Sequence, residues 1–257
     1  MDLKKKIIII VGFCLILSAS VIVILTRMFD KLEDQLLQKC RIEALIGARV
    51  MSTFMELMIH TKLLTADQVN GTEYKEIEGT NPKQYHTQYD AVFDQTILKF
   101  EDELLNDEDV VFSILIDKNG YVPTHNSKYS LPPDKDPQKN LIYSRSKRNF
   151  SDKQEIKEVL QYRGTDTVRY PYHRDTGEVM WNIGAPVMLQ GKYWGAYLIG
   201  ISLQRIDIIK NQMVIIIVTI MIINLSFTLL IILAVIPRKY LMHPPTEGGA
   251  DTTGRPA

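Results

Sequence analysis

Residues 167–203 read TVRYPYHRDTGEVMWNIGAPVMLQGKYWGAYLIGISL, and this stretch decides the fold of the central part of the chain. It contains three runs rich in β-branched and aromatic residues, Thr167–His173, Glu178–Leu189 and Tyr193–Leu203. The turn sequences between them, Arg174-Asp-Thr-Gly177 and Gln190-Gly-Lys192, are short, so each strand pairs with the next one along the chain. The stretch therefore predicts a three-stranded antiparallel meander.

A further β segment precedes the meander. Val110–Ile116 is a short β-rich run, Asp117-Lys-Asn-Gly120 follows it, and Tyr121–Thr124 resumes extended sequence. An Asn-Gly turn between two such runs predicts a hairpin. Ser127–Asp152 carries three prolines and many charges, which predicts a long loop with a short helix in it, of the kind that often serves binding.

Helical patterns come before the hairpin. Residues 30–64 contain no proline and one glycine, and their apolar residues recur at steps of three and four, which predicts a long helix. Asn70–Gln88 is polar and predicts a connection, and Asp90–Leu105 predicts a second helix. Helices followed by a hairpin, a crossing loop and a meander predict an α+β domain with one antiparallel sheet and a cavity between the sheet and the loop.

The long helix carries two apolar stripes. The first consists of Leu36, Cys40, Ala44, Ala48, Met51, Met55 and Met58, and the second of Ile42, Leu45, Val50, Phe54 and Leu57. Two apolar faces indicate two partners, either the domain behind the helix and a second copy in a parallel dimer, or two surfaces of one chain. Cys40 is expected to be a half-buried helical residue or, alternatively, to form a disulfide between two copies of the helix.

Two apolar runs stand near the ends of the chain, Ile7–Thr26 and Met213–Ile236, and neither contains a charged residue. A helix rising about 1.5 Å per residue needs roughly 20 apolar residues to cross a bilayer. Lysines precede the first run, and Arg238 and Lys239 follow the second, so both termini are expected in the cytoplasm. The alternative for the first run is a cleaved signal peptide, but the apolar run continues beyond the small residues at 18–20.

These runs predict a two-pass membrane protein in five parts. We expect a cytoplasmic N-terminus (1–6), a first transmembrane helix (7–26), an extracytoplasmic domain (27–212), a second transmembrane helix (213–236) and a cytoplasmic tail (237–257). The chain carries 30 basic and 30 acidic residues, so its composition gives no sign of nucleic-acid binding.

The sequence offers no convincing catalytic centre. The histidines of the central region, His60, His86, His125 and His173, show no metal-ligand spacing, and no Cys-x-x-Cys-His haem motif occurs. We therefore expect a protein that is not an enzyme and that uses no metal or other cofactor.

Binding of a small molecule has better support, because arginine forks suit carboxylates and aromatic walls suit a small organic body. The candidate ligand-binding residues are Tyr121, His125, Arg145, Arg148, Tyr170, Tyr172, Arg174 and Trp181. Strand alternation places Tyr170, Tyr172 and Arg174 on one face and Arg169, Pro171 and His173 on the other, so only one of these sets can line a cavity. Arginine and tyrosine together favour a small carboxylate.

Four motifs follow one another within about 80 residues, a specific combination. They are Asp117-Lys-Asn-Gly-Tyr-Val-Pro-Thr-His-Asn126, Ser144-Arg-Ser-Lys-Arg-Asn-Phe-Ser-Asp152, His173-Arg-Asp-Thr-Gly-Glu178 with Ala185-Pro186, and Gly191-Lys-Tyr-Trp-Gly195. Together they resemble the extracytoplasmic sensor region of a group of bacterial methyl-accepting chemotaxis proteins. The resemblance implies a single PAS-like Cache domain in the inner membrane, with a five-stranded antiparallel sheet behind a long stalk helix, dimeric through that helix, and a small-molecule ligand.

The sequence after the second span resembles the entry to a HAMP relay, in Ile236-Pro-Arg-Lys-Tyr-Leu-Met-His-Pro244. Pro245, Gly248 and Gly249 then stand where a HAMP helix needs helix formers. We expect a receptor truncated at the start of HAMP, a chemoreceptor-like sensor that binds an extracytoplasmic ligand and transmits a conformational signal across the membrane. The alternative is a non-sensing interaction subunit or decoy that pairs with full-length receptors.

Overall fold

The computed structural model describes residues 2–236, so the HAMP-like tail expected at 237–257 lies outside the described residues. The chain forms two compact units: residues 32–209 make the larger one, and the two terminal segments, up to Lys31 and from Lys210 on, make the other. Each unit is treated by itself below.

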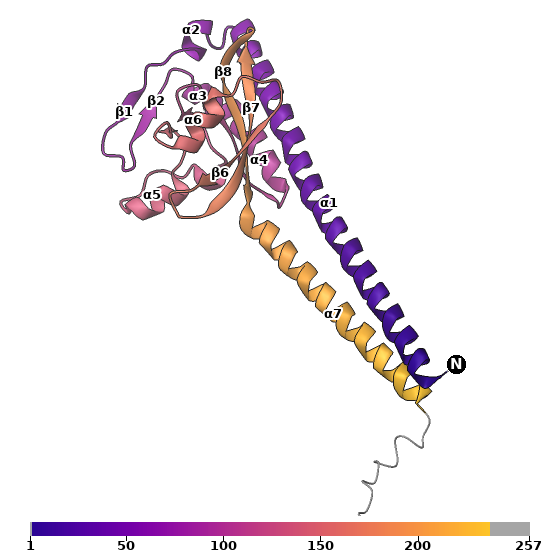
Figure 1. Ribbon diagram of the computed structural model, residues 1–257. Coiled ribbons are helices and arrows are strands. Elements are labelled where there is room, and N and C mark those ends of the chain that lie inside the picture. Colours follow the sequence, from indigo (N-terminus) through magenta and orange to yellow (C-terminus); the bar gives the residue numbers. More distant parts are fainter. Residues whose placement is uncertain (1, 237–257) are drawn as a thin grey trace, which may run out of the picture. The chain divides into compact units, whose positions relative to one another are not determined.

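The larger unit is built on a four-stranded antiparallel sheet in the order β3-β8-β7-β6. Figure 1 labels β6, β7 and β8 of this sheet. Its strands are β3 (Val110–Asp117), β6 (Val168–His173), β7 (Val179–Leu189) and β8 (Lys192–Ser202). Both meander turns contain a glycine in the left-handed region, Gly177 at φ +82° and Gly191 at φ +76°, a backbone geometry that other residues adopt at a cost. The predicted meander is confirmed to within two residues at each strand end.

One face of the sheet packs against α1 (Leu3–His60). Of the first apolar stripe, all residues from Cys40 to Met58 are buried, in a cluster with the sheet residues Leu115, Ile183, Tyr197 and Ile199. Gly47 allows the close approach, because a Cβ there would lie 2.3 Å from the ring of Tyr197. Cys40 is fully buried rather than half-buried, and its burial raises the pKa of its thiol to about 12.

The opposite face of the sheet is covered by α6 (Gln154–Gln161) and by the segment from β4 to β5. Ile156, Val159 and Leu160 of α6 pack there with Ile114 and Leu198. The sequence interpretation assigned no structure to α6, since a single two-turn helix with one apolar face gives a short periodic signal and no side chain caps its N-terminus.

The predicted hairpin at Val110–Thr124 is wrong, and so is the five-stranded sheet. β4 (Tyr121–Val122) pairs with β5 (Arg148–Asn149) in a separate two-stranded sheet. The cause is the carboxylate of Asp117, which accepts hydrogen bonds from the backbone N–H groups of Asn119 at 2.8 Å and Tyr121 at 2.9 Å. These bonds turn the chain away from β3.

Two further predictions are corrected in detail. The connection expected at Asn70–Gln88 contains a short hairpin of β1 (Lys75–Ile77) and β2 (Gln84–His86) after α2 (Ala66–Val69). The helix expected at Asp90–Leu105 is divided at Ile97 into α3 (Asp90–Thr96), α4 (Leu98–Glu103) and the 3₁₀ turn η1 (Leu104–Asn106). The long loop holds η2 (Ser127–Tyr129) and α5 (Pro137–Tyr143), the short helix that was expected.

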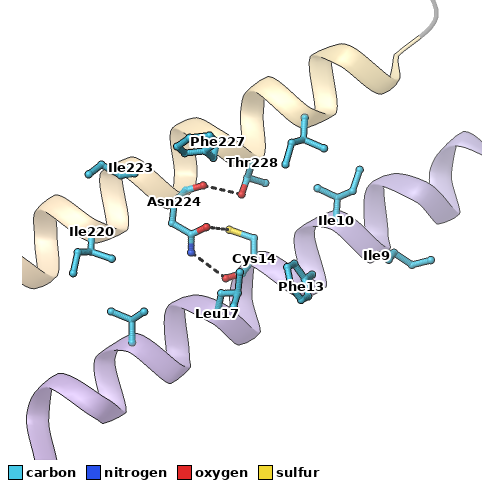
Figure 2. A pocket seen from close by; sticks show the side chains of 12 residues that line it. Ile9, Ile10, Phe13, Cys14, Leu17, Ile220, Ile223, Asn224, Phe227 and Thr228 are labelled. Atoms are coloured by element: carbon cyan, nitrogen blue, oxygen red, sulfur yellow. Dashed lines mark hydrogen bonds between the residues drawn. The ribbon is translucent and has the colours of Figure 1, made fainter.

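The terminal unit contains the apolar end of α1 and most of α7 (Leu203–Val235). Both helices are long and apolar enough to cross a membrane. Figure 2 shows Asn224 of α7 directed at α1, where its amide nitrogen donates to the carbonyl of Cys14 at 3.4 Å. The same nitrogen also donates to the hydroxyl of Ser18 at 2.8 Å. Ser226 instead bonds back to the carbonyl of Ile222 on its own helix. Of Asn224 and Ser226, only Asn224 therefore joins the two apolar helices, which border an apolar groove of about 550 Å³.

Candidate functional site

A small cavity lies on the sheet face opposite α1. Its apolar wall comes from the sheet, from α6 and from the β4–β5 segment, and its polar wall comes from four side chains. The lining residues are Phe112, Ile114, Ile116, Val122, His125, Arg145, Phe150, Ile156, Tyr172, Asn182 and Leu198. The cavity has a volume of about 20 Å³, which is room for about one water molecule.

Two buried side chains in this cavity have unsatisfied polar atoms. Neither the amide nitrogen nor the amide oxygen of Asn182 has a hydrogen-bond partner in the described part of the chain, and Asn182 is fully buried in β7. The Nδ1 atom of His125 is likewise buried without a partner among residues 2–236. A buried polar group without a partner costs about 1–3 kcal/mol, so such groups are expected where a ligand or water completes the bonding.

Arg145 connects the cavity to a cluster of charges. One of its NH groups donates to the hydroxyl of Tyr172 at 3.0 Å, and the other lies 3.1 Å from the carboxylate of Asp175. The same carboxylate also binds Arg148 at 3.1 Å and Lys153 at 2.8 Å. Three cations therefore share one carboxylate, in a place where both arginines are buried.

A second ion pair lies beside this cluster. Arg174 is buried, stacks over the ring of Tyr129 and binds Glu178 at 2.9 Å. Its Nε has no partner within the described residues, and the same is true of one NH group of Arg148. The region thus has spare N–H donors as well as an excess of positive charge, the combination that suits an anion.

The charges fix the protonation of the site. Burial, and then the positive charges of Arg145, Arg174 and Arg148, hold the pKa of His125 well below its usual value. Burial alone would raise the pKa of Asp175, but the hydrogen bond from Lys153 and the charges of the two arginines lower it instead. His125 is therefore neutral and Asp175 ionised at neutral pH.

The structure brings five of the eight sequence candidates together. His125, Arg145 and Tyr172 line the cavity, and Arg148 and Arg174 lie in the charge clusters next to it. The alternation along β6 is confirmed, since Tyr172 and Arg174 are buried while Arg169, Pro171 and His173 are exposed.

The other three candidates lie outside the cavity lining. Tyr170 is partly buried against the core of the same sheet face. Tyr121 packs with the α1-side core and donates its hydroxyl proton to Asp90 at 2.8 Å. Trp181 packs on the α1 side under Arg169, and Trp194 is a core residue on the same side.

Sequence reasoning missed Asn182 and Asp175. A sequence signal for Asn182 was present, because alternation along the strand places it with Met180 and Gly184 on the face opposite the α1-side core residues. A polar residue at such a position indicates a candidate site residue. Asp175 had none, because its partners are 22 to 30 residues away in the sequence. Within residues 2–236, no cluster of three or more histidine, cysteine or acidic side chains is arranged to hold a metal ion.

No protein family model and no curated protein matches the chain. Among solved structures, it is similar to the ligand-binding domain of the Campylobacter jejuni chemoreceptor Tlp3 in complex with L-valine, at 12% identity and a TM-score of 0.41, over 74% of this chain and 64% of that one. It is also similar to the sensor domain of the V. cholerae histidine kinase DctB, at 15% identity and a TM-score of 0.37, over 71% of this chain and 58% of that one. A third is the E. coli DcuS sensor domain, at 16% identity and a TM-score of 0.31, over 46% of this chain and 71% of that one.

The chain thus spans less than two thirds of the Tlp3 and DctB chains that it matches. These structures belong to the class that the sequence motifs indicated, namely sensor and ligand-binding domains.

Proposed function

We propose that the chain is a membrane-anchored sensor whose larger unit binds a small ligand in the cavity opposite α1. The two apolar helices would anchor it in the inner membrane as a two-pass protein, with residues 32–209 outside the cytoplasm. The lysines before the first span and Arg238 and Lys239 after the second support this orientation.

The observation that carries the proposal is the unsatisfied amide of Asn182. A fully buried asparagine on a central strand is expected to have partners, and here its nitrogen and oxygen both face a cavity without one in the described chain. His125 offers a second unsatisfied group in the same cavity, and Arg145 adds a cation. Uncompensated polarity of this kind is typical of sites kept for function at the expense of stability.

The chain also offers a route for the signal. β8 ends at Ser202 and α7 begins at Leu203, so no loop separates a strand of the ligand-binding sheet from the second membrane helix. Leu198 of β8 lines the cavity directly. A ligand that favours one of two arrangements of β8 would shift α7, since movements of about 1–2 Å in packed helices are enough in known switches.

Dimerisation through α1 is part of the proposal. Ile42, Ile46 and Leu57 lie on the face of α1 that is turned away from the core, and 45%, 50% and 54% of their surfaces are exposed. A second copy anchored in the same membrane would present the same face in a parallel orientation.

A ligand screen on the purified full-length chain in detergent micelles tests the sensor function. Trp181 and Trp194 are the only tryptophans and both lie in the larger unit, so tryptophan fluorescence reports the melting of that unit alone. We expect at least one compound among organic acids and amino acids to raise the melting temperature, because a ligand of the folded state stabilises it by mass action. A folded domain that no compound stabilises would contradict the proposal and favour the interaction subunit.

Two matched asparagine variants locate the site. Asn182 and Asn126 are both fully buried, but the amide of Asn126 is satisfied by Ser113 and Glu101, at 2.9 and 2.6 Å. Without ligand, Asn182→Leu is expected to raise the melting temperature and Asn126→Leu to lower it, because only the second change breaks hydrogen bonds. A destabilised Asn182→Leu protein would show that this amide has partners and is structural.

A further inference from the structure

We propose that the carboxylate of Asp175 is an internal anion that occupies the position of the ligand's carboxylate, and that a small carboxylate binds by displacing it. The inference rests on the proposed function and names both the ligand class and the group that the ligand must replace. Around Asp175, the positive groups outnumber the single carboxylate that they bind.

The three cations that hold Asp175 come from one stretch of the chain, between α5 and α6, and Asp175 comes from another. Arg145 precedes β5, Arg148 is its first residue, Lys153 precedes α6, and Asp175 lies in the turn between β6 and β7. Three positive groups face one carboxylate, and one NH group of Arg148 has no partner in the described chain. The cation set therefore has charge and donors to spare for an anion.

The cavity requires something to move before a ligand can enter. Its volume of about 20 Å³ holds about one water molecule, which is less than the smallest organic acids need. Arg145 lines the cavity and also binds Asp175, so it is the point where the cavity and the cation set meet. Removing the Asp175 side chain from this point would enlarge the cavity at its positive end.

The tip of the turn that carries Asp175 is exposed and meets no neighbouring segment of the described chain. Thr176 and Gly177 are exposed, and a Cβ built on Gly177 would meet nothing within 4 Å. The turn is closed by two backbone hydrogen bonds, from Gly177 to the carbonyl of Arg174 and from Arg174 to the carbonyl of Glu178, both 2.9 Å. On its inner side the turn is held by the carboxylate of Asp175 and by the buried side chain of Arg174 against Tyr129. A second carboxylate that takes the place of Asp175 would release the first of these two contacts.

The same geometry limits the ligand. Its carboxylate would bind Arg145, Arg148 and Lys153, and its short remainder would face Asn182, Tyr172 and the neutral His125. A compact carboxylate with one further hydrogen-bonding group, such as a hydroxyl or a keto oxygen, can bind the three cations with its carboxylate and the cavity side chains with that group.

The test compares acetate binding by three forms of the full-length chain in detergent micelles: the unaltered protein, Asp175→Asn and Glu155→Gln. Glu155 is the matched control, because it is an acidic residue in α6 whose ion pair is with His173, whereas Lys153 of the cation set acts on it only through a longer-range charge interaction. Sodium chloride at equal ionic strength controls for general salt effects. We expect Asp175→Asn to bind acetate about tenfold or more tightly than the unaltered protein, and Glu155→Gln to bind it as the unaltered protein does.

Equal or weaker acetate binding by Asp175→Asn would overturn the inference, and so would a lack of acetate binding by both proteins. The sensor function is tested separately by the ligand screen, and it fails if no compound in that screen stabilises the protein. If Asp175→Asn does not fold, hydrogen exchange of the unaltered protein shows whether acetate displaces Asp175. Saturating acetate should speed the exchange of the Gly177 and Arg174 amides, whereas unchanged exchange with acetate bound would show that Asp175 stays in place.

Discussion

Glu101 shows at the residue scale how much polarity this domain buries. Its side chain is fully buried in α4, one carboxyl oxygen accepts the N–H of Leu115 at 2.9 Å, and the other has no partner in the described chain. Its carbonyl accepts hydrogen bonds from Ser113 and Asn126. Burial raises the pKa of Glu101 well above its usual value of 4.5, so the folded protein holds this proton at pH values where the unfolded chain releases it.

The contribution of Glu101 to stability should therefore fall as the pH rises above about 4.5, because the folded state keeps this proton where the unfolded state releases it. In Glu101→Gln, which has no proton to lose, this contribution disappears, and the variant should melt at a higher temperature than the unaltered protein at pH 7. Tryptophan-fluorescence melting between pH 4 and pH 8 measures it. Parallel pH profiles for the two proteins would contradict the assignment.

At the scale of elements, the packing of α1 on the sheet depends on Gly47. The ring of Tyr197 occupies the space where a side chain at position 47 would stand. Tyr197 is held there from behind, since its hydroxyl donates to Ser113 at 3.2 Å. α1 can approach β8 this closely only where it has no Cβ.

Gly47→Ala should destabilise the larger unit by about 1–3 kcal/mol, the usual cost of overpacking a core. Gly12→Ala is the matched control, because it makes the same change in the same helix where nothing lies within 4 Å of the new Cβ. Tryptophan-fluorescence melting should fall for the first variant and stay unchanged for the second. A Gly47→Ala protein as stable as the control would show that α1 and the sheet are not packed as described.

The elements also show what the sequence could predict. The meander and the buried stripe of α1 follow from periodicity and turn residues, which are local properties. β4 pairs with β5, which is distant in the sequence, because hydrogen bonds to the side chain of Asp117 turn the chain before β4. No periodic pattern in the sequence predicts this pairing. The same distinction holds for the candidate site. The alternation of residues along the strand predicted that Tyr172 and Arg174 share a face. The ion pairs of Arg145, Arg148 and Lys153 with Asp175 are tertiary contacts that no local pattern predicts.

At the scale of the whole molecule, we propose that two copies of the chain act as a pair through α1. The larger unit buries the first stripe of α1 in its own core and leaves Ile42 and Ile46 exposed. Cys40 lies in the buried stripe, so the buried thiol is not available for the cross-chain disulfide that the sequence left open.

Ile46→Glu should weaken the dimer, because it places a charge in the apolar contact between two α1 helices. Leu131→Glu is the matched control, since Leu131 is 51% exposed against 50% for Ile46 but lies in the loop after η2. Sedimentation of the full-length chain in detergent micelles should show a shift toward monomer for the first variant alone. Equal behaviour of the two variants would exclude this face of α1 as the dimer interface.

The central claim is that the cavity at Asn182 is the ligand site, and a calorimetric titration tests it most directly. The compound that stabilises the protein most in the ligand screen is titrated into the unaltered chain and into Asn182→Leu, both at full length in detergent micelles. The account predicts binding to the unaltered protein and affinity at least about tenfold weaker in the variant, which loses the amide while remaining folded. Equal affinity for the two proteins would place the ligand elsewhere and contradict the account.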